Sequence, residues 1–440
     1  MERGMVSVDQ WSGGSQAYFL THLHADHTVG LSPTWKQGPL FCSRTTAKLF
    51  PVKFPGFNLS LLRVLEIGHW HSLSLASPST GSDTTLQVMA IDADHCPGAV
   101  MYLFYGEFGC MLYTGDFCWE TTSKRAQIGK SMLLNAIGLK KVDILYLDNT
   151  YCNPSYCFPS REIAAQQVVD IITSHPEHDI IIGIDSLGKE DLLLYIARVL
   201  NIKIWVWPER LQIMHLLGFH DIFTTNTSLT RVRAVPRYSF SIDTLEGLNT
   251  MHPTIGIMPS GLSWKLKPLE GKSSFFGSGP SNLHHSRSKL CTKSGSQSDK
   301  LKLSESFSSV EKYHEYIYAV PYSDHSCFDE IKKFVKLVQP SKLRGIVSSS
   351  PSYVSPLYHL GRLLQPNQTS QALHRNFEKR GDNRFEAVIA GFAPGSGNSA
   401  AARTKRRRKR ELLRVRLSRV KILRRLGCGT KILELADSNS

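Results

Sequence analysis

The chain has 440 residues and 41% of them are hydrophobic, so it can bury the cores of two domains or of one large composite domain. Its net charge of +15 arises mostly at one end, because residues 403–425 hold thirteen lysines and arginines against one acidic residue. No apolar run approaches the roughly 18 residues that a membrane-spanning helix requires, so no such helix is expected. Nine cysteines without a CxxC pair, and the lack of a secretory signal, predict reduced thiols in a cytosolic or nuclear protein.

The densest group of chemically active side chains lies in the sequence THLHADHTVG, which starts at Thr21. The apolar residues 17–20 before it predict a buried strand, so the group falls on the turn where this strand leaves its sheet. Alternating histidines would point to one side of an extended chain, and the aspartate and third histidine would follow as the chain curls toward a helix. Imidazole nitrogens and carboxylates bind zinc, manganese or iron, so this turn could serve two neighbouring metal positions. A solvated polar loop, the alternative, does not explain the density of the candidate ligands His22, His24, Asp26 and His27.

Two further candidate ligands follow strand-like segments downstream. Strands are expected at residues 86–91, 99–105 and 110–114, the last two joined by a four-residue turn with a glycine at each end. His95 lies on a tight turn within DADHCPG, and Asp116 follows the third strand within TGD. Either residue alone would more often be structural, but at matching strand ends they would complete a metal site with the first group.

The middle of the chain alternates between segments typical of helices and of strands. Helices are expected at residues 160–175 and 189–200, and strands at residues 180–184 and 202–206. This alternation predicts a small parallel α/β unit. Ser160 can cap the first helix, and the side chains expected on its buried face are Ile163, Val168, Ile171 and Ile172.

The turn between the second of these strands and its helix has the sequence DSLGKE, at residues 185–190. Free backbone N–H groups and the positive end of the helix dipole favour an anion at such a turn, and a lysine adds positive charge. Ser186, Gly188 and Lys189 are therefore candidates for binding a phosphate group of the substrate. Ordinary helix capping is the alternative interpretation of the same residues.

Three more acidic or imidazole side chains also follow predicted strands. Asp9 ends a short strand near the amino terminus, where it could support metal ligands or simply form a turn. Asp148 follows a strand at residues 144–147 within LDNTYCNP. His325 follows a strand at residues 316–320 within YSDHS. All three are candidate members of the same site.

The carboxyl-terminal third is uneven in composition. Residues 266–312 are rich in serine, lysine and glycine, which predicts a disordered insertion, and a helix at 328–338 and a strand at 343–347 follow it. Residues 366–440 form a basic, mostly disordered tail. Its KRRRKR run at residues 405–410 is typical of nuclear import or nucleic-acid contact, with a solvated tail as the alternative.

Together these motifs resemble those of the metallo-β-lactamase superfamily, in the same order. From LDNT, SLGKE and YSDHS onward they resemble its β-CASP group, and in particular the DNA cross-link repair nucleases. The resemblance covers most of residues 1–365 and implies an α/β fold. It implies a metallo-β-lactamase αββα sandwich formed by residues 1–155 and 313–365, with an α/β β-CASP domain inserted at residues 156–265.

The resemblance also implies two divalent metal ions, zinc first, with manganese or magnesium as alternatives. His22, His24, His95 and Asp116 would bind one ion, and Asp26, His27, Asp116 and His325 the other. The residues implied to be catalytic are Asp26, Asp116, Asp148 and His325, and Asp9 would support the ligands from behind.

The implied function is a DNA nuclease of the nucleus that acts on 5′-phosphorylated ends, as a 5′-to-3′ exonuclease in DNA repair. Repair of interstrand cross-links is the implied process, with processing of chromosome ends as a second one. The protein would be a monomer with DNA-repair proteins as partners. An RNA-processing endonuclease is the main alternative, disfavoured because residues 343–347 lack the late histidine of RNA-cutting relatives. A small-molecule hydrolase and a non-catalytic scaffold are the others. One departure is Cys118, which stands where the family motif TGDFR has arginine.

Overall fold

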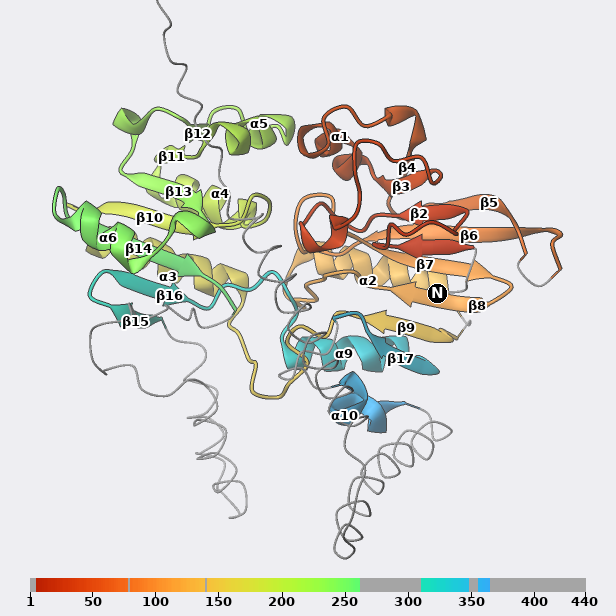
Figure 1. Cartoon of the computed structure of the whole chain (residues 1–440). Helices are drawn as coiled ribbons and strands as arrows, with labels where there is room; N and C mark the ends of the chain where they lie inside the picture. Colours follow the sequence, from red (N-terminus) through yellow and green to blue (C-terminus); the bar gives the residue numbers. More distant parts are fainter. Residues whose placement is uncertain (1–4, 78–79, 139–140, 262–309, 348–354, 365–440) are drawn as a thin grey trace, which may run out of the picture. The chain divides into compact units, whose positions relative to one another are not determined.

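The computed structural model contains three sheets with helices packed against them (Figure 1). The residues that it describes are 5–77, 80–138, 141–261, 310–347 and 355–364. The predicted tail and nearly all of the predicted insertion lie outside them, although strand β15 (Glu311–His314) begins within the last residues of that insertion. In this described part of the chain, no helix combines the length and apolar character needed to cross a membrane, and no disulfide joins two cysteines.

Two sheets face each other in the first part of the fold. One has four parallel strands, β1 (Val6–Val8), β2 (Ala17–Phe19), β3 (Leu40–Ser43) and β4 (Leu62–Leu65). The other has the order β17-β9-β8-β7-β6-β5, with bounds Lys342–Gly345, Ile144–Leu147, Gly109–Tyr113, Val100–Gly106, Asp83–Asp92 and Trp70–Ala76. Aromatic rings fill the space between them: the Phe19 ring lies 5.3 Å from that of Tyr102 and 4.9 Å from that of Phe104.

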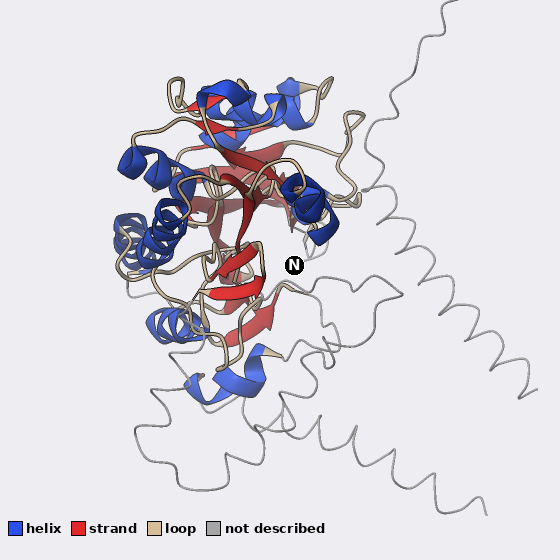
Figure 2. Ribbon diagram, turned by 90° about the vertical axis from the view of Figure 1, so that its left-hand side faces the viewer, coloured by secondary structure: helices blue, strands red, loops and turns tan. Residues whose placement is uncertain are grey.

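Helices cover the outer faces of these two sheets. Helix α1 (Arg44–Lys53) contacts β3 and β4, and helix α2 (Lys124–Ile137) contacts β6. Helix α9 (Phe328–Val338) packs against the segment between β8 and α2, where the ring of Phe334 lies 4.7 Å from that of Trp119. A short helix, α10 (Pro356–Leu360), contacts β17. The layers therefore follow the order helix, sheet, sheet, helix, and Figure 2 shows the helices lying against the sheet faces.

The third sheet has the order β12-β11-β13-β10-β14-β16-β15, and all its strands are parallel except β15. Its other bounds are Phe223–Thr224, Ile204–Trp205, Val232–Pro236, Asp179–Ile184, Thr254–Pro259 and Ile317–Val320. Side chains on one face pack with α3 (Arg161–Ser174), α4 (Glu190–Leu200) and α5 (Pro208–Leu216), and those on the other with α6 (Ile242–Asn249). Because both faces are covered, β10 is a continuous apolar run.

Most predicted elements are confirmed, and β9 and α9 have the predicted bounds. Ser160 caps α3 as expected, accepting a hydrogen bond from the N–H of Ile163 at 3.3 Å. The expected burial of Ile163 was wrong: its side chain is 55% exposed. The buried stripe of α3 runs instead through Ala164, Ala165 and Val168, and a residue one position away is rotated by about 100° around the helix.

One predicted domain boundary also differs from the structure. The sequence interpretation placed residues from 313 onward with the first two sheets, but β16 pairs with β14 and so belongs to the third sheet. An alternating strand pattern identifies a strand without identifying its neighbour, and only hydrogen bonding to β14 settles the sheet. The chain returns to the first part after Val320.

The carboxyl ends of the parallel strands in the third sheet lie along one edge. The DSLGK turn follows β10 at this edge, and the YSDH turn follows β16. Nε2 of His24 lies 3.0 Å from the carbonyl oxygen of Leu187, and Nδ1 of His95 lies 2.8 Å from that of Asp324. The edge therefore meets the turns of the first two sheets where the predicted ligands lie.

Candidate metal centre

Five histidines and one aspartate from separate strand ends converge on one place. His22, His24 and His27 follow β2, and His27 lies in a 3₁₀ turn at Asp26–Thr28. His95 lies between β6 and β7, Asp116 follows β8, and His325 follows β16. Distances between ring centroids within the group are 4.1 Å for His22 and His27, 4.8 Å for His24 and His95, and 4.6 Å for His95 and His325. The structure thus brings together six of the seven predicted ligands.

The carboxylate of Asp116 lies in the middle of this group. Its Oδ2 is 3.2 Å from Nε2 of His27, 3.6 Å from Nε2 of His22 and 3.7 Å from Nε2 of His95. The side chain is 9% exposed, so these imidazoles surround it in place of water. One oxygen that faces nitrogens on several sides could contact two ions, and the bridging role of Asp116 stays a prediction.

Two of the imidazoles point unprotonated nitrogens at each other. His24 donates from Nε2 to the carbonyl oxygen of Leu187, and His95 donates from Nδ1 to that of Asp324. A neutral imidazole has one N–H, so these bonds leave lone pairs on Nδ1 of His24 and Nε2 of His95. These two nitrogens are only 3.0 Å apart. Two facing lone pairs repel unless a cation or a proton lies between them.

His22 is fully buried and adds a third such nitrogen. The Thr21 hydroxyl donates to Oδ2 of Asp9 at 2.7 Å and can accept from Nδ1 of His22 at 3.0 Å. Nε2 of His22 has no hydrogen-bond partner although it is buried. Leaving a buried polar atom unpaired costs about 1–3 kcal/mol, and a bound cation would remove this cost. The donor set therefore fits a metal ion of the kind that imidazoles bind.

The remaining two histidines are held by carboxylates. Nδ1 of His27 donates to Oδ2 of Asp9 at 2.7 Å, and Nδ1 of His325 donates to Oδ2 of Asp148 at 2.8 Å. Both bonds leave Nε2 as the nitrogen that is free to bind a metal. Carboxylates that orient metal-binding histidines in this way also make the imidazole a stronger ligand. Asp9 and Asp148 thus each bind one candidate ligand, and their role in supporting a metal site stays a prediction.

The electrostatics of the site separate the histidines into two sets. Burial lowers the pKa of His22, His24 and His95, and the neighbouring imidazoles lower the pKa of His22 and His95 further. These three side chains are therefore neutral at pH 7 and able to act as ligands.

The second set has the opposite shift. Burial alone would lower the pKa of His27, but hydrogen bonds to Asp116 and Asp9 outweigh it and raise the pKa to about 11. Burial is likewise outweighed at His325, where the negative charges of Asp148 and Asp116 raise the pKa to about 9. Burial alone would raise the pKa of Asp116. The hydrogen bond to His27 and the positive charge of His325 outweigh this effect, so the pKa of Asp116 lies well below the usual range. Protons thus supply positive charge here when no metal does.

Asp26 and Cys96 occupy the border of the group. The carboxylate of Asp26 is 79% exposed, and its Oδ2 lies 3.8 Å from Nε2 of His27, so it reaches the site from the solvent side. Cys96 was not predicted. Its thiol lies close enough to His22, His24 and His95 to count among their potential ligand atoms. Burial raises the pKa of this thiol well above the usual range, which keeps it protonated and a poor ligand.

The predicted phosphate turn lies directly beside these histidines. Gly188 has φ +101, and a Cβ there would lie 3.4 Å from Oδ2 of Asp324 and 3.8 Å from Nε2 of His24. The backbone conformation therefore favours glycine, whereas the distances alone would leave room for a Cβ atom. Lys189 forms an ion pair with Asp324, and its side chain is 12% exposed.

A buried arginine that sequence reasoning missed holds this turn in place. Arg210 of α5 is fully buried and donates to the carbonyl oxygens of Ser186 and Gly188. It also pairs with Glu190 at 2.8 Å. The sequence signal for it is weak, because one arginine in a helix is usually at the surface.

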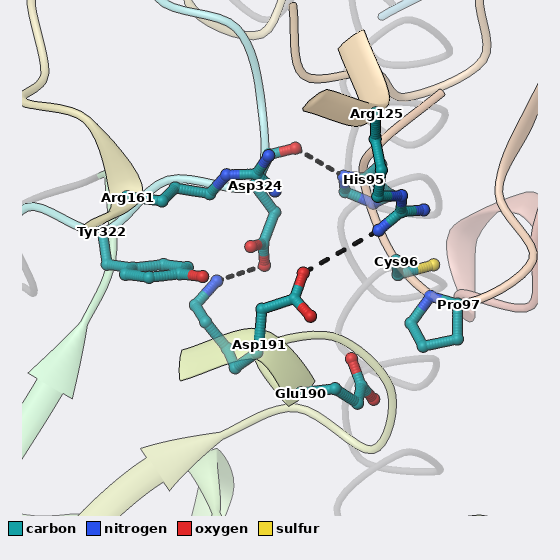
Figure 3. Close-up of a pocket in the computed structure, with 10 residues that line it drawn as sticks. His95, Cys96, Pro97, Arg125, Arg161, Glu190, Asp191, Tyr322 and Asp324 are labelled. Atoms are coloured by element: carbon teal, nitrogen blue, oxygen red, sulfur yellow. Dashed lines mark hydrogen bonds and ion pairs between the residues drawn. The ribbon is translucent and has the colours of Figure 1, made fainter. Parts of the chain in front are cut away.

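Lys189 also lines a small pocket, which Figure 3 shows. Its other lining residues are His95, Cys96, Pro97, Arg125, Arg161, Glu190, Asp191, Tyr322 and Asp324. Arg125 pairs with Asp94 at 3.2 Å, and Arg161 pairs with Asp94 and with Glu120. Cys118, the residue that departs from the family motif, is buried near Arg161. Burial raises the pKa of its thiol, and the charge of Arg161 opposes this only in part.

The sequence is similar to known DNA-repair proteins. Residues 219–350 match the family model described as DNA repair metallo-beta-lactamase. The chain is 36% identical to the 5' exonuclease Apollo of Gallus gallus over 356 residues, which cover 80% of this chain and 63% of the relative. It is 36% identical to the same protein of Mus musculus, with 79% and 54% covered. Identity to the DNA cross-link repair 1A protein of Homo sapiens is 32%, with 75% and 28% covered. The chain thus spans less than two thirds of the length of these relatives.

Proposed function

Because the chain belongs to the metallo-β-lactamase/β-CASP family of DNA-repair nucleases, we propose that it is a metal-dependent DNA nuclease that degrades 5′-phosphorylated ends in the 5′-to-3′ direction. The observation that carries this proposal is the convergence of three imidazole nitrogens, from His22, His27 and His95, on the buried carboxylate of Asp116. The relatives named above are a 5' exonuclease and a cross-link repair protein, and repair of interstrand cross-links or processing of chromosome ends is the setting proposed for this chain.

The site would hold two divalent ions, with zinc favoured by its imidazole-rich donors and manganese or magnesium as alternatives. His22, His24, His95 and Asp116 would bind one ion, and Asp26, His27, Asp116 and His325 the other. A pair of ions at such a site activates water and neutralises charge on the scissile phosphate. Asp9 and Asp148 keep Nε2 of their histidines directed into the site.

The fold proposed for this function is an αββα sandwich with an inserted β-CASP domain. The two facing sheets with their outer helices correspond to the sandwich. The third sheet corresponds to the insert. Because β16 pairs with β14, the insert would extend to Val320 rather than end at residue 265. The metal centre would lie where the turns of both parts meet.

Recognition of the 5′ phosphate is proposed for Ser186, Gly188 and Lys189. The turn precedes the first residue of α4, and Leu187 within it contacts His24, so a phosphate held there would lie close to the metal ligands. Lys189 is already paired with Asp324. A phosphate would therefore share this lysine with Asp324, and the ion pair would keep the ammonium oriented when DNA is absent.

The test is digestion of end-labelled single- and double-stranded DNA and of RNA, with zinc, manganese or magnesium, and with 5′-phosphate or 5′-hydroxyl ends. Shortening of 5′-phosphorylated DNA from its 5′ end is the expected result. Cleavage of RNA in preference to DNA would favour the RNA-processing alternative. Equal rates on the two 5′ ends would exclude the phosphate site.

Lys189→Ala should reduce the preference for 5′-phosphorylated ends by about 1–3 kcal/mol while leaving the metal content unchanged. Lys130→Ala removes an exposed lysine from α2 and serves as the charge-matched control. An equal effect of both substitutions on the two kinds of end would show that Lys189 acts only as general positive charge.

The basic residues 403–425, which lie outside the described part of the chain, are proposed to contact DNA or direct import into the nucleus. Deleting them should flatten the dependence of DNA binding on salt concentration, because each phosphate contact releases counterions. An unchanged slope would leave import as their role. DNA-repair proteins are the proposed partners.

A further inference from the structure

The carboxyl edge of the third sheet carries one more turn beside the phosphate turn. Strands β10 and β13 are parallel neighbours, and Ile184 pairs with Pro236 at their carboxyl ends. The chain leaves β10 into Asp185 and leaves β13 into Arg237 and Tyr238. In parallel α/β sheets, ligands bind outside the carboxyl ends of the strands. Both turns therefore lie at the edge that meets the metal centre.

Arg237 is close to the phosphate turn and to the wall of the site. Its guanidinium lies 3.8 Å from the carboxylate of Asp185, and its side chain remains 38% exposed. The positive charge of Arg237 also acts electrostatically on Tyr151, where it opposes the rise in the pKa of the Tyr151 hydroxyl that burial causes. The Tyr151 ring lies 5.9 Å from that of His325. The contact with Asp185 is long and solvent-exposed, so it stabilises the fold little and leaves the arginine available to an anion.

Tyr238 presents an aromatic ring to solvent at the same turn. It is 89% exposed, more than any other large hydrophobic side chain in the described part of the chain. A ring this exposed contributes almost nothing to the core, so folding does not require it. Aromatic rings next to positive charge are the combination on which single-stranded nucleic acids bind, by stacking of bases and pairing of phosphates.

The distance to the metal centre suits a bound strand. His24 contacts Leu187, Asp185 is two residues earlier, and Arg237 contacts Asp185 next to Tyr238. Only a few residues and two side-chain contacts therefore separate Tyr238 from His24, so one bound strand can touch both.

We propose that Arg237 and Tyr238 hold the DNA strand a few nucleotides from the cleavage point, with Tyr238 stacking on a base and Arg237 binding a backbone phosphate. The inference rests on the proposed nuclease function and names residues that position its substrate. An unpaired strand is the substrate form that fits, because stacking on a protein ring requires a base face that is not covered by its neighbours.

The experiment compares Tyr238→Ala, Tyr238→Phe and the unaltered chain on 5′-phosphorylated single-stranded oligonucleotides that carry one abasic position, moved stepwise over the first eight nucleotides. Tyr358→Ala is the control, since Tyr358 is 78% exposed on α10. In the unaltered chain, one abasic position should raise KM roughly ten-fold. Tyr238→Ala should raise KM on the intact strand by a similar factor and should no longer respond to that position. Tyr238→Phe should behave like the unaltered chain.

Arg237→Ala should lower the slope of log Kd against log salt concentration by about one unit, the contribution of one phosphate contact. Arg198→Ala, at the exposed last turn of α4, is its matched control and should leave the slope unchanged. If Tyr238→Ala keeps full sensitivity to the abasic position, or behaves like Tyr358→Ala, the inference is overturned while cleavage by the unaltered chain upholds the proposed function. If the unaltered chain cleaves no DNA with any metal, the proposed function itself fails.

Discussion

The two halves of the proposed metal centre hold their histidines by different means. In the first half, His22, His24 and His95 are oriented by a hydroxyl and two backbone carbonyls, all uncharged. In the second half, His27 and His325 are oriented by the carboxylates of Asp9 and Asp148. In the first half His22 and His95 are buried, whereas the second half includes the exposed carboxylate of Asp26.

This difference gives the halves different responses to protons. Uncharged partners do not offset the effect of burial, so the pKa values of the first set are lowered and the imidazoles stand ready to bind. Carboxylate partners raise the pKa of His27 to about 11 and of His325 to about 9, so each keeps a proton until a metal displaces it. We expect the first half to bind its ion tightly and the second to be the half that exchanges.

The largest effect should come from the residue that both halves share. Asp116→Asn removes the bridging charge, so it should abolish cleavage and reduce bound metal from two ions per chain to one or none. Metal content is measured by elemental analysis and folding by circular dichroism. Asp170→Asn, an exposed carboxylate on α3, is the control. Two retained ions in the Asp116 variant would contradict the bridging role.

Removing one histidine from each half should separate the two positions. His325→Ala should abolish cleavage yet retain one ion, because the first half stays complete. His22→Ala should lose the more tightly bound ion. The metal that remains in this variant should then be removed more easily by a chelator. Identical metal content and chelator resistance in the two variants would show that the halves do not bind independently. Asp26→Asn should resemble His325→Ala, with little loss of folded structure.

Metal binding should also depend on pH in one half only. At pH 7 the raised pKa values mean that His27 and His325 are protonated in the metal-free protein, so binding there releases protons. The affinity should therefore fall as pH falls, by roughly ten-fold per pH unit for each proton released. The first half should be nearly independent of pH from 7 to 8, since its histidines are already neutral. Calorimetry in buffers of different ionisation enthalpy counts the protons, and equal proton release at both positions would refute the distinction.

The smallest effect should come from the supporting carboxylates. Asp148→Asn keeps the shape of the side chain but removes its charge, so the pKa of His325 should fall. Activity or affinity for the second ion should fall about ten- to a hundred-fold. Asp9→Asn should lower the pKa of His27 in the same way. Its effect should be larger if the bond between Asp9 and the Thr21 hydroxyl also helps to orient His22. The affinity of the first half, measured in parallel, should change little in Asp148→Asn.

Local patterns in the sequence predicted the ligand types and the ends of the strands that carry them. The apolar strand before THLHADHTVG, the turn at His95 and the run before Asp116 all lie as predicted, because short apolar runs and turn residues act over a few positions. The same reasoning failed at Ile163, where several apolar residues in α3 left the orientation of the buried face to its packing against the third sheet.

The sequence by itself predicted most of the side chains that could bind a metal, because residue types and their spacing after strands are local properties; it missed Cys96. The tertiary structure decided how they are held. The partners of His24 and His95 are the backbone carbonyls of Leu187 and Asp324, 163 and 229 residues away, and any residue type could supply them. The role of Arg210, the pairing of β16 with β14 and the neighbouring turns at Asp185 and Arg237 likewise arise only when distant strands are joined. Residue types are local information, whereas the proximity of backbone groups is created by folding.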